Sequence, residues 1–207
     1  IYEALQEGWK NNLRNCWWII DYNRQSLDGV VREGLFKRVE QIFDAFGWDV
    51  VRVKYGTLQR KAFAEEGGNK LKDWIDDCPN QLYSALTYMG GAVWRERLMD
   101  ALGDQGDVTA LLNAHNDAEL AALMENLGGN CVETMAETFV AIKHDGPVCF
   151  MAYTIKGWGT PIAGHKDNHG GLMNKTQMAA WQKHMGVAEG EEWEKFATIE
   201  NPEELQK

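Results

Sequence analysis

Short apolar runs and longer helical repeats alternate along the chain. The runs lie at residues 16–21, 49–53 and 148–155, and each is rich in Val, Ile or aromatic residues and bounded by polar residues or Gly. Runs of this length and composition are typical of buried strands. Because continuous apolar strands suit a parallel sheet covered on both faces, we predict three buried parallel strands.

Helical periodicity fills the segments between these runs. Apolar residues recur at helical spacing in 33–46, and the repeat stops at Gly47. Further helices are predicted at 116–127, which begins with the capping pair Asn116 and Glu119, at 130–144 and at 175–185. The order strand, helix, strand, long helical excursion over 55–145, strand predicts an α/β fold with a mainly parallel sheet flanked by helices. We interpret residues 1–207 as one partial domain.

Composition narrows the class of protein. The 207 residues carry 44% hydrophobic and 25% charged residues, as is ordinary for a globular protein. The net charge of −10 argues against nucleic acid and anionic membranes as partners, since both need a basic surface. The four cysteines lack the paired spacings of a zinc site, so we expect reduced thiols in a cytoplasmic protein. The chain does not begin with Met, and we expect it to be part of a longer or processed polypeptide.

The most informative polar residues follow the first predicted strand. That strand leads to the carboxyl edge of the sheet, where open α/β folds bind ligands. Asn23 and Gln25 come next, and they lie on the same side if the chain stays extended. Amide oxygens suit a Mg²⁺ ion that already holds phosphate oxygens. A plain polar turn after a strand is the alternative, and the spacing alone favours it.

A resemblance to a known family favours the Mg²⁺ site over the plain polar turn. Residues 21–29 read Asp21-Tyr22-Asn23-Arg24-Gln25-Ser26-Leu27-Asp28-Gly29. This segment resembles the closing half of the thiamine-diphosphate motif, Asn-x-Asn-x-Gln-x-Leu-Asp-Gly, of the homodimeric, bacterial-type pyruvate dehydrogenase family in the transketolase-like superfamily. The resemblance implies a thiamine-diphosphate-binding fold in which the Asn23 side chain and the Gln25 carbonyl bind Mg²⁺. It also implies that Leu27 lines the cofactor and that Asp21, where the family often has Asn, lies near the diphosphate. The Gly-Asp-Gly that opens the motif is expected before Ile1.

Two further segments extend the resemblance. Residues 154–159 (Thr-Ile-Lys-Gly-Trp-Gly) are similar to the family pattern Thr-Ile-Lys-Gly-Tyr-Gly, which implies that Lys156 approaches the cofactor diphosphate. The glycine-rich loop 157–172 is predicted to be polar and mobile. Residues 163–170 resemble the superfamily segment Ala-Gly-Thr-His-Asp-Ser-His-Gly, which implies a catalytic role for His169 and makes His165 a second candidate.

The resemblance implies a function for the whole enzyme. Arg95-Glu96 and residues 126–130 are similar to the pyruvate dehydrogenase family and not obviously to transketolases. The implied reaction is decarboxylation of pyruvate with thiamine diphosphate and Mg²⁺, followed by acetyl transfer to a lipoyl-bearing acyltransferase component. The implied assembly is a homodimer or association with the remaining part of the same enzyme. The activating glutamate of the family belongs to a second domain that this chain lacks, so we expect the chain alone to be inactive. A transketolase moving two-carbon ketol units between sugars, and a non-catalytic structural fragment, are the alternatives.

Overall fold

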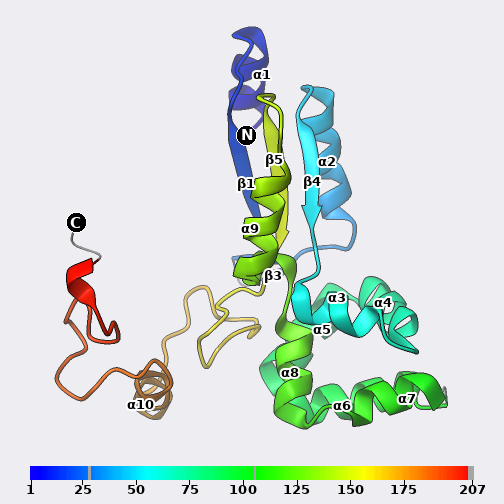
Figure 1. Cartoon of the computed structure of the whole chain (residues 1–207), viewed down its shortest axis with the longest axis vertical. Coiled ribbons are helices and arrows are strands. Elements are labelled where there is room, and N and C mark those ends of the chain that lie inside the picture. The colour runs from blue at the N-terminus through cyan, green and yellow to red at the C-terminus, as the bar shows by residue number, and fades with distance from the viewer. Residues whose placement is uncertain (28, 105, 205–207) are drawn as a thin grey trace.

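A parallel sheet organises the computed structural model, which describes residues 1–27, 29–104 and 106–204. Strands β1 (Trp17–Tyr22), β4 (Asp49–Val53) and β5 (Val148–Tyr153) form a sheet of order β1-β5-β4 within that part of the chain (Figure 1). Both outer strands align their first residue with Val148, so the carboxyl ends meet at one edge. The predicted α/β fold with a parallel sheet is confirmed. β5 ends two residues earlier than predicted, because the Ile155 N–H donates to the Asn130 side chain instead of to a strand.

Helices cover both faces of the sheet. β5 is the central strand and every residue in it is buried, as its continuous apolar run predicts. On one face, Leu5 of α1 (Tyr2–Lys10) and Phe43 of α2 (Leu35–Ala45) pack with Cys149. On the other face, Phe139 of α9 (Val132–Ala141) packs with Phe150. The sheet is therefore the middle layer of a three-layer arrangement, with helices on both of its faces.

The long excursion between β4 and β5 forms a separate helical layer beyond the carboxyl edge of the sheet (Figure 1). Tyr83 and Trp94 are fully buried at its centre, with ring centroids 5.0 Å apart. As predicted, the excursion holds several helices, and α8 begins with the expected capping box of Asn116 and Glu119. These helices are α3 (Thr57–Phe63), α4 (Gly68–Asp77), α5 (Asn80–Met89), α6 (Gly91–Leu102), α7 (Gly106–Asn113) and α8 (Asp117–Glu125).

Two glycines hold this layer against the strand ends. They lie in the short 3-10 turn η1 (Gly128–Asn130), which replaces the start of the helix predicted at 130–144. A Cβ on Gly128 would lie 2.5 Å from the Val53 carbonyl oxygen, and one on Gly129 would lie 2.8 Å from that of Tyr153. Only glycine allows backbone to approach backbone this closely. The turn therefore fixes the helical layer relative to the ends of β4 and β5.

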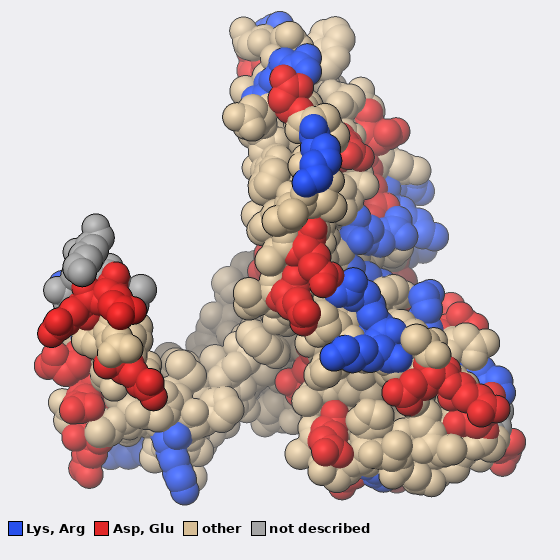
Figure 2. Space-filling view, viewed as in Figure 1, with Lys and Arg blue, Asp and Glu red and all other residues tan. Residues whose placement is uncertain are grey.

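Beyond the loop that follows β5, the chain extends away from the rest of the molecule (Figure 1). It contains α10 (Lys175–His184), whose residues are exposed or half-buried, and η2 (Pro202–Glu204). Figure 2 shows acidic side chains gathered on this segment, and basic side chains gathered where the sheet meets the helical layer. Among the helices that the structure describes, none has the length and apolar character needed to cross a membrane.

Candidate functional site

The chain turns sharply where β1 ends. Arg24 and Leu27 have φ angles of 65° and 55°, in the left-handed region that residues other than Gly rarely adopt. Between and after them, β2 (Gln25–Ser26) and β3 (Gly29–Val30) pair as a small antiparallel hairpin. The chain therefore does not stay extended through Gln25, which was the condition for placing Asn23 and Gln25 on the same side. Asp28 lies outside the described residues.

The turn nevertheless places the predicted magnesium ligands on one side. The Gln25 N–H donates to the Asn23 side-chain oxygen at 3.0 Å. Beside the Gln25–Val30 pair, the Val31 N–H donates to the Arg24 carbonyl at 2.8 Å, so the N–H and C=O of Gln25 both point away from β3. The Gln25 carbonyl therefore faces the same side as the Asn23 amide oxygen.

Asp21 orients the Asn23 amide. Its carboxylate accepts a hydrogen bond from the Asn23 side-chain nitrogen at 3.2 Å and another from the Thr154 hydroxyl. The amide nitrogen thus faces Asp21 and the amide oxygen faces Gln25. Thr154 lies directly after β5, so this contact also ties the ends of the two neighbouring strands together. Sequence reasoning gave Thr154 no role, although it stands in the segment that carries Lys156.

Lys156 reaches the same turn from the end of β5. Its ammonium group donates to the carbonyl of Leu27, whose side chain is 66% exposed. The structure therefore brings five of the predicted site residues together at the carboxyl edge of the sheet: Asp21, Asn23, Gln25, Leu27 and Lys156. This edge of the sheet therefore carries the Lys156 ammonium group, the Asp21 carboxylate, and two uncharged oxygens from the Asn23 side chain and the Gln25 carbonyl.

The two candidate histidines lie on the loop that follows. His165 packs its ring against Tyr88 of α5, with centroids 4.5 Å apart, and its Nδ1 accepts the Asp167 N–H at 3.1 Å. His169 is exposed and has no hydrogen bond to any residue in the described part of the chain. Neither histidine forms a hydrogen bond with Asn23 or Lys156 in the part of the chain that the structure describes.

Part of this loop is anchored more firmly than the sequence predicts. The Asn168 side chain donates to the Lys156 carbonyl at 2.8 Å, and a Cβ on Gly164 would lie 2.6 Å from the Ser84 carbonyl oxygen of α5. Glycine here serves close packing as well as freedom of the backbone. That the loop is mobile stays a prediction.

The donor set at the turn fits a Mg²⁺ ion that brings other ligands with it. No group of three or more His, Cys, Asp or Glu side chains within the described ranges is arranged to hold a metal. Two uncharged oxygens are too few for an octahedral Mg²⁺ site, so phosphate oxygens, water or a further carboxylate must complete it. In addition, Gln25 Oε1 is buried without a hydrogen-bond partner among the described residues, and a bound group would satisfy it. The turn thus fits a shared metal–diphosphate site better than a site made by the protein alone.

Cys131 stands directly before α9, at its N-cap position and close to the glycine turn. It is one of four free thiols, as predicted, and its sulfur contacts the N–H and the hydroxyl of Thr57, each at 3.5 Å. Burial raises the pKa of this thiol, but side-chain hydrogen bonds from Thr134 and Thr57 outweigh burial and lower the pKa to about 6. The pKa of this thiol therefore lies well below that of an ordinary cysteine.

This cap should make stability depend on pH. Because the folded-state pKa lies below the unfolded value, the thiolate contributes stability that is present above the unfolded pKa and is lost as pH falls through about 6. Relative to Cys131→Ser, which removes the titratable thiol at this position, we expect the wild type to gain about 1–2 kcal/mol between pH 5.5 and 9. Urea unfolding of both proteins across this range measures the difference, and a difference that does not change with pH would contradict it.

Several curated proteins are similar to this chain in sequence. No protein-family model matches the chain. The "Pyruvate dehydrogenase E1 component" of Pseudomonas aeruginosa is 28% identical over 161 residues, which are 76% of this chain and 18% of that protein. The proteins of the same name from Cupriavidus necator and Escherichia coli K12 are 26% and 25% identical over 87% and 84% of this chain, and 20% of their own length. The chain is therefore similar, over most of its length, to a segment that makes up about one fifth of the pyruvate dehydrogenase E1 component.

Proposed function

We propose that this chain provides the diphosphate- and Mg²⁺-binding part of a thiamine-diphosphate-dependent pyruvate dehydrogenase E1 component. The observation that carries the proposal is the meeting of Asn23, Gln25 and Lys156 at the carboxyl edge of a parallel sheet. That meeting occurs in a chain whose similarity to E1 components runs through most of its length. Neither observation alone would separate this site from an ordinary polar turn.

Each residue at the turn has a distinct task in this proposal. Thiamine diphosphate, when bound, supplies the electron sink for decarboxylation of the 2-oxoacid. The Asn23 side chain and the Gln25 carbonyl bind Mg²⁺, and Asp21 holds the Asn23 amide with its oxygen facing the metal. Lys156 exchanges its bond with the Leu27 carbonyl for one with a diphosphate oxygen, since a charged acceptor is the stronger partner. Leu27 is then the apolar neighbour of the cofactor.

The remaining requirements of the reaction lie beyond these residues. His169 is exposed on its loop and is available to a substrate or intermediate, which makes it the first candidate for proton transfer, ahead of His165. The glutamate that assists proton removal from the cofactor would come from a second domain. We therefore infer that the chain alone does not turn over pyruvate.

Partners are inferred from the sheet and from the class of reaction. β1 is an edge strand, and its side chains Trp17 and Ile19 are 45% and 52% exposed. Exposed apolar residues on a free strand edge favour a covering partner, which here is the rest of the same enzyme or the second subunit of a homodimer. The acetyl group would pass to a lipoyl-bearing acyltransferase component, and a cytoplasmic location follows from the proposed enzyme class.

Replacing Asn23 by Ala tests the proposed metal ligand. We expect the affinity of the full chain for thiamine diphosphate with Mg²⁺ to fall at least about tenfold, because a small octahedral cation tolerates loss of a ligand poorly. Calorimetric titration with and without Mg²⁺ measures this. Asn113→Ala, at an exposed position on α7, is the matched control and should bind like the wild type. Equal affinity of the Asn23 variant and the control would remove Asn23 from the site.

A further inference from the structure

A buried arginine lies behind the turn that carries Asn23 and Gln25. Arg24 is only 8% exposed, and its guanidinium group stacks over the Tyr83 ring at 4.4 Å. Its one hydrogen bond to a described residue is a long one, 3.4 Å from Nη2 to the Thr154 carbonyl, and Nε has no partner there. A guanidinium group offers five N–H donors, so most of them are unused.

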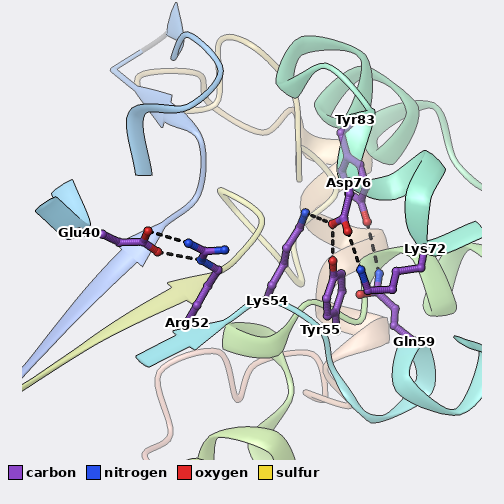
Figure 3. Close-up of polar contacts among 8 residues, drawn as sticks. All are labelled: Glu40, Arg52, Lys54, Tyr55, Gln59, Lys72, Asp76 and Tyr83. Carbon is purple, nitrogen blue, oxygen red and sulfur yellow. Dashed lines mark hydrogen bonds and ion pairs between the residues drawn. The ribbon is translucent and has the colours of Figure 1, made fainter. Parts of the chain in front are cut away.

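No carboxylate in the described part of the chain forms an ion pair with Arg24. Two of the three carboxylates that line the same cavity are engaged elsewhere. Asp76 accepts hydrogen bonds from Lys54, Lys72 and Tyr55 (Figure 3), and Glu33 accepts the Asn80 N–H at 3.3 Å. An unpaired buried charge is costly, so its presence points to a partner that the chain does not supply.

The guanidinium group borders a cavity of about 270 Å³. The cavity lies between the hairpin after β1, the start of α2, the end of α4 and the start of α5. Its wall includes the apolar side chains of Phe36, Ile75 and Leu127. Tyr22 also lines it, and its hydroxyl is buried. Burial raises the pKa of Tyr22, so the hydroxyl stays protonated and can donate.

The charges around the cavity select the kind of anion. Arg24 has no ion-pair partner among the described residues, Lys54 is paired with Asp76, and Glu33 and Asp77 also line the wall. A phosphate dianion would bring a second negative charge close to these carboxylates. A carboxylate carries a single charge and two coplanar oxygens, which match the planar fork of a guanidinium group. The apolar wall suits a short hydrocarbon tail, since a cavity of about 150 Å³ already accepts benzene.

We propose that this cavity binds a small monocarboxylate, with its carboxylate group on Arg24 and the Tyr22 hydroxyl and its tail against Phe36, Ile75 and Leu127. The site is separate from the proposed diphosphate site, because Arg24 points behind the turn on which Asn23 and Gln25 are displayed. The inference does not depend on the proposed function, since it uses the charge and shape of the cavity alone. Occupancy would stabilise the left-handed conformation of Arg24, and with it the neighbouring turn.

Saturation-transfer NMR of sodium butyrate with the full chain, at ionic strength held constant with NaCl, tests the proposal. We expect saturable binding with a dissociation constant of roughly 1 mM, as befits so small a ligand. In Arg24→Met, butyrate affinity should fall at least about tenfold, because the charged hydrogen bonds are lost. Arg14→Met is the matched control, since Arg14 is already paired with Asp145 and lines a different groove; it should bind butyrate like the wild type.

A second variant covers the case in which Arg24→Met does not fold. Cys78→Phe keeps Arg24 but fills part of the cavity from its wall, and it should lose butyrate binding while circular dichroism shows a folded chain. Absence of saturable binding by the wild type, or equal affinity in Arg24→Met, would overturn the proposal. Displacement of butyrate by an equal concentration of chloride would also overturn it, because the site would then select charge and not a carboxylate.

Discussion

Trp94→Ala should lower the free energy of unfolding by about 3–5 kcal/mol, the range for truncating a large aromatic side chain in a core. Trp94 is 0% exposed and packs edge-to-face against Tyr83 and Trp74, with centroids 5.0 and 6.1 Å away. Its removal would leave a void among α4, α5 and α6 that rigid helices fill only in part. Because whole domains are stable by only about 5–15 kcal/mol, this loss should shift the urea midpoint strongly.

The matched control is the same substitution at an exposed tryptophan. Trp193 is 95% exposed in the C-terminal segment, so Trp193→Ala should change the free energy of unfolding by less than about 0.5 kcal/mol. Urea unfolding followed by circular dichroism compares the two variants without relying on tryptophan fluorescence. Equal effects of the two substitutions would contradict the helical layer described above.

Lys156→Met should weaken binding of thiamine diphosphate by about 10- to 100-fold, the worth of a charge-assisted hydrogen bond to phosphate. Met keeps the length and apolar stem of Lys, so the substitution removes the charge with little change in volume. The Lys156 ammonium group already reaches the turn by bonding the Leu27 carbonyl, so it needs only a small movement to meet a diphosphate oxygen there. Titration with the cofactor in the presence of Mg²⁺ measures the loss.

Lys166→Met provides the comparison for this effect. Lys166 is an exposed residue of the same loop and is paired with its neighbour Asp167. Both substitutions change the net charge by the same amount, so a difference in cofactor affinity between the two variants reflects the position of Lys156. Thiamine itself, which lacks phosphate groups, should bind both variants alike; a weakened affinity for thiamine in Lys156→Met would show that the residue acts on something other than the diphosphate.

Strands and helices followed closely from the sequence because their signals are local. The apolar runs predicted β1, β4 and β5 to within two residues at each end, and the capping pair of Asn116 and Glu119 marked the start of α8. Hydrophobic periodicity and helix caps depend on residues close together in the sequence, and the tertiary packing of this chain favours the same elements. The helical excursion was likewise expected, although the way its helices pack together was not.

The turn after β1 was harder to predict for a physical reason. Arg24 and Leu27 adopt left-handed backbone conformations without being Gly, Asn or Asp, so local propensity favoured an extended chain. The surrounding contacts override it: the Arg24 guanidinium stacks on Tyr83, which is distant in sequence, and Lys156 bonds the Leu27 carbonyl. The resemblance indicated which residues meet at the site, but the hairpin and the buried Arg24 depend on contacts that spacing cannot reveal.

Paramagnetic broadening by Mn²⁺ tests the central claim most directly. Mn²⁺ takes the same hard oxygen ligands as Mg²⁺ and broadens nearby amide resonances, so it reports where the metal lies. With thiamine diphosphate added to the isotopically labelled full chain, we predict loss of the amide signals of residues 21–27 and 154–157, and recovery of those signals in Asn23→Ala. Titration of Mn²⁺ without the cofactor identifies unspecific binding to the acidic C-terminal segment. Cofactor-dependent broadening elsewhere in the chain, or none at these residues, would contradict the proposed diphosphate and metal site.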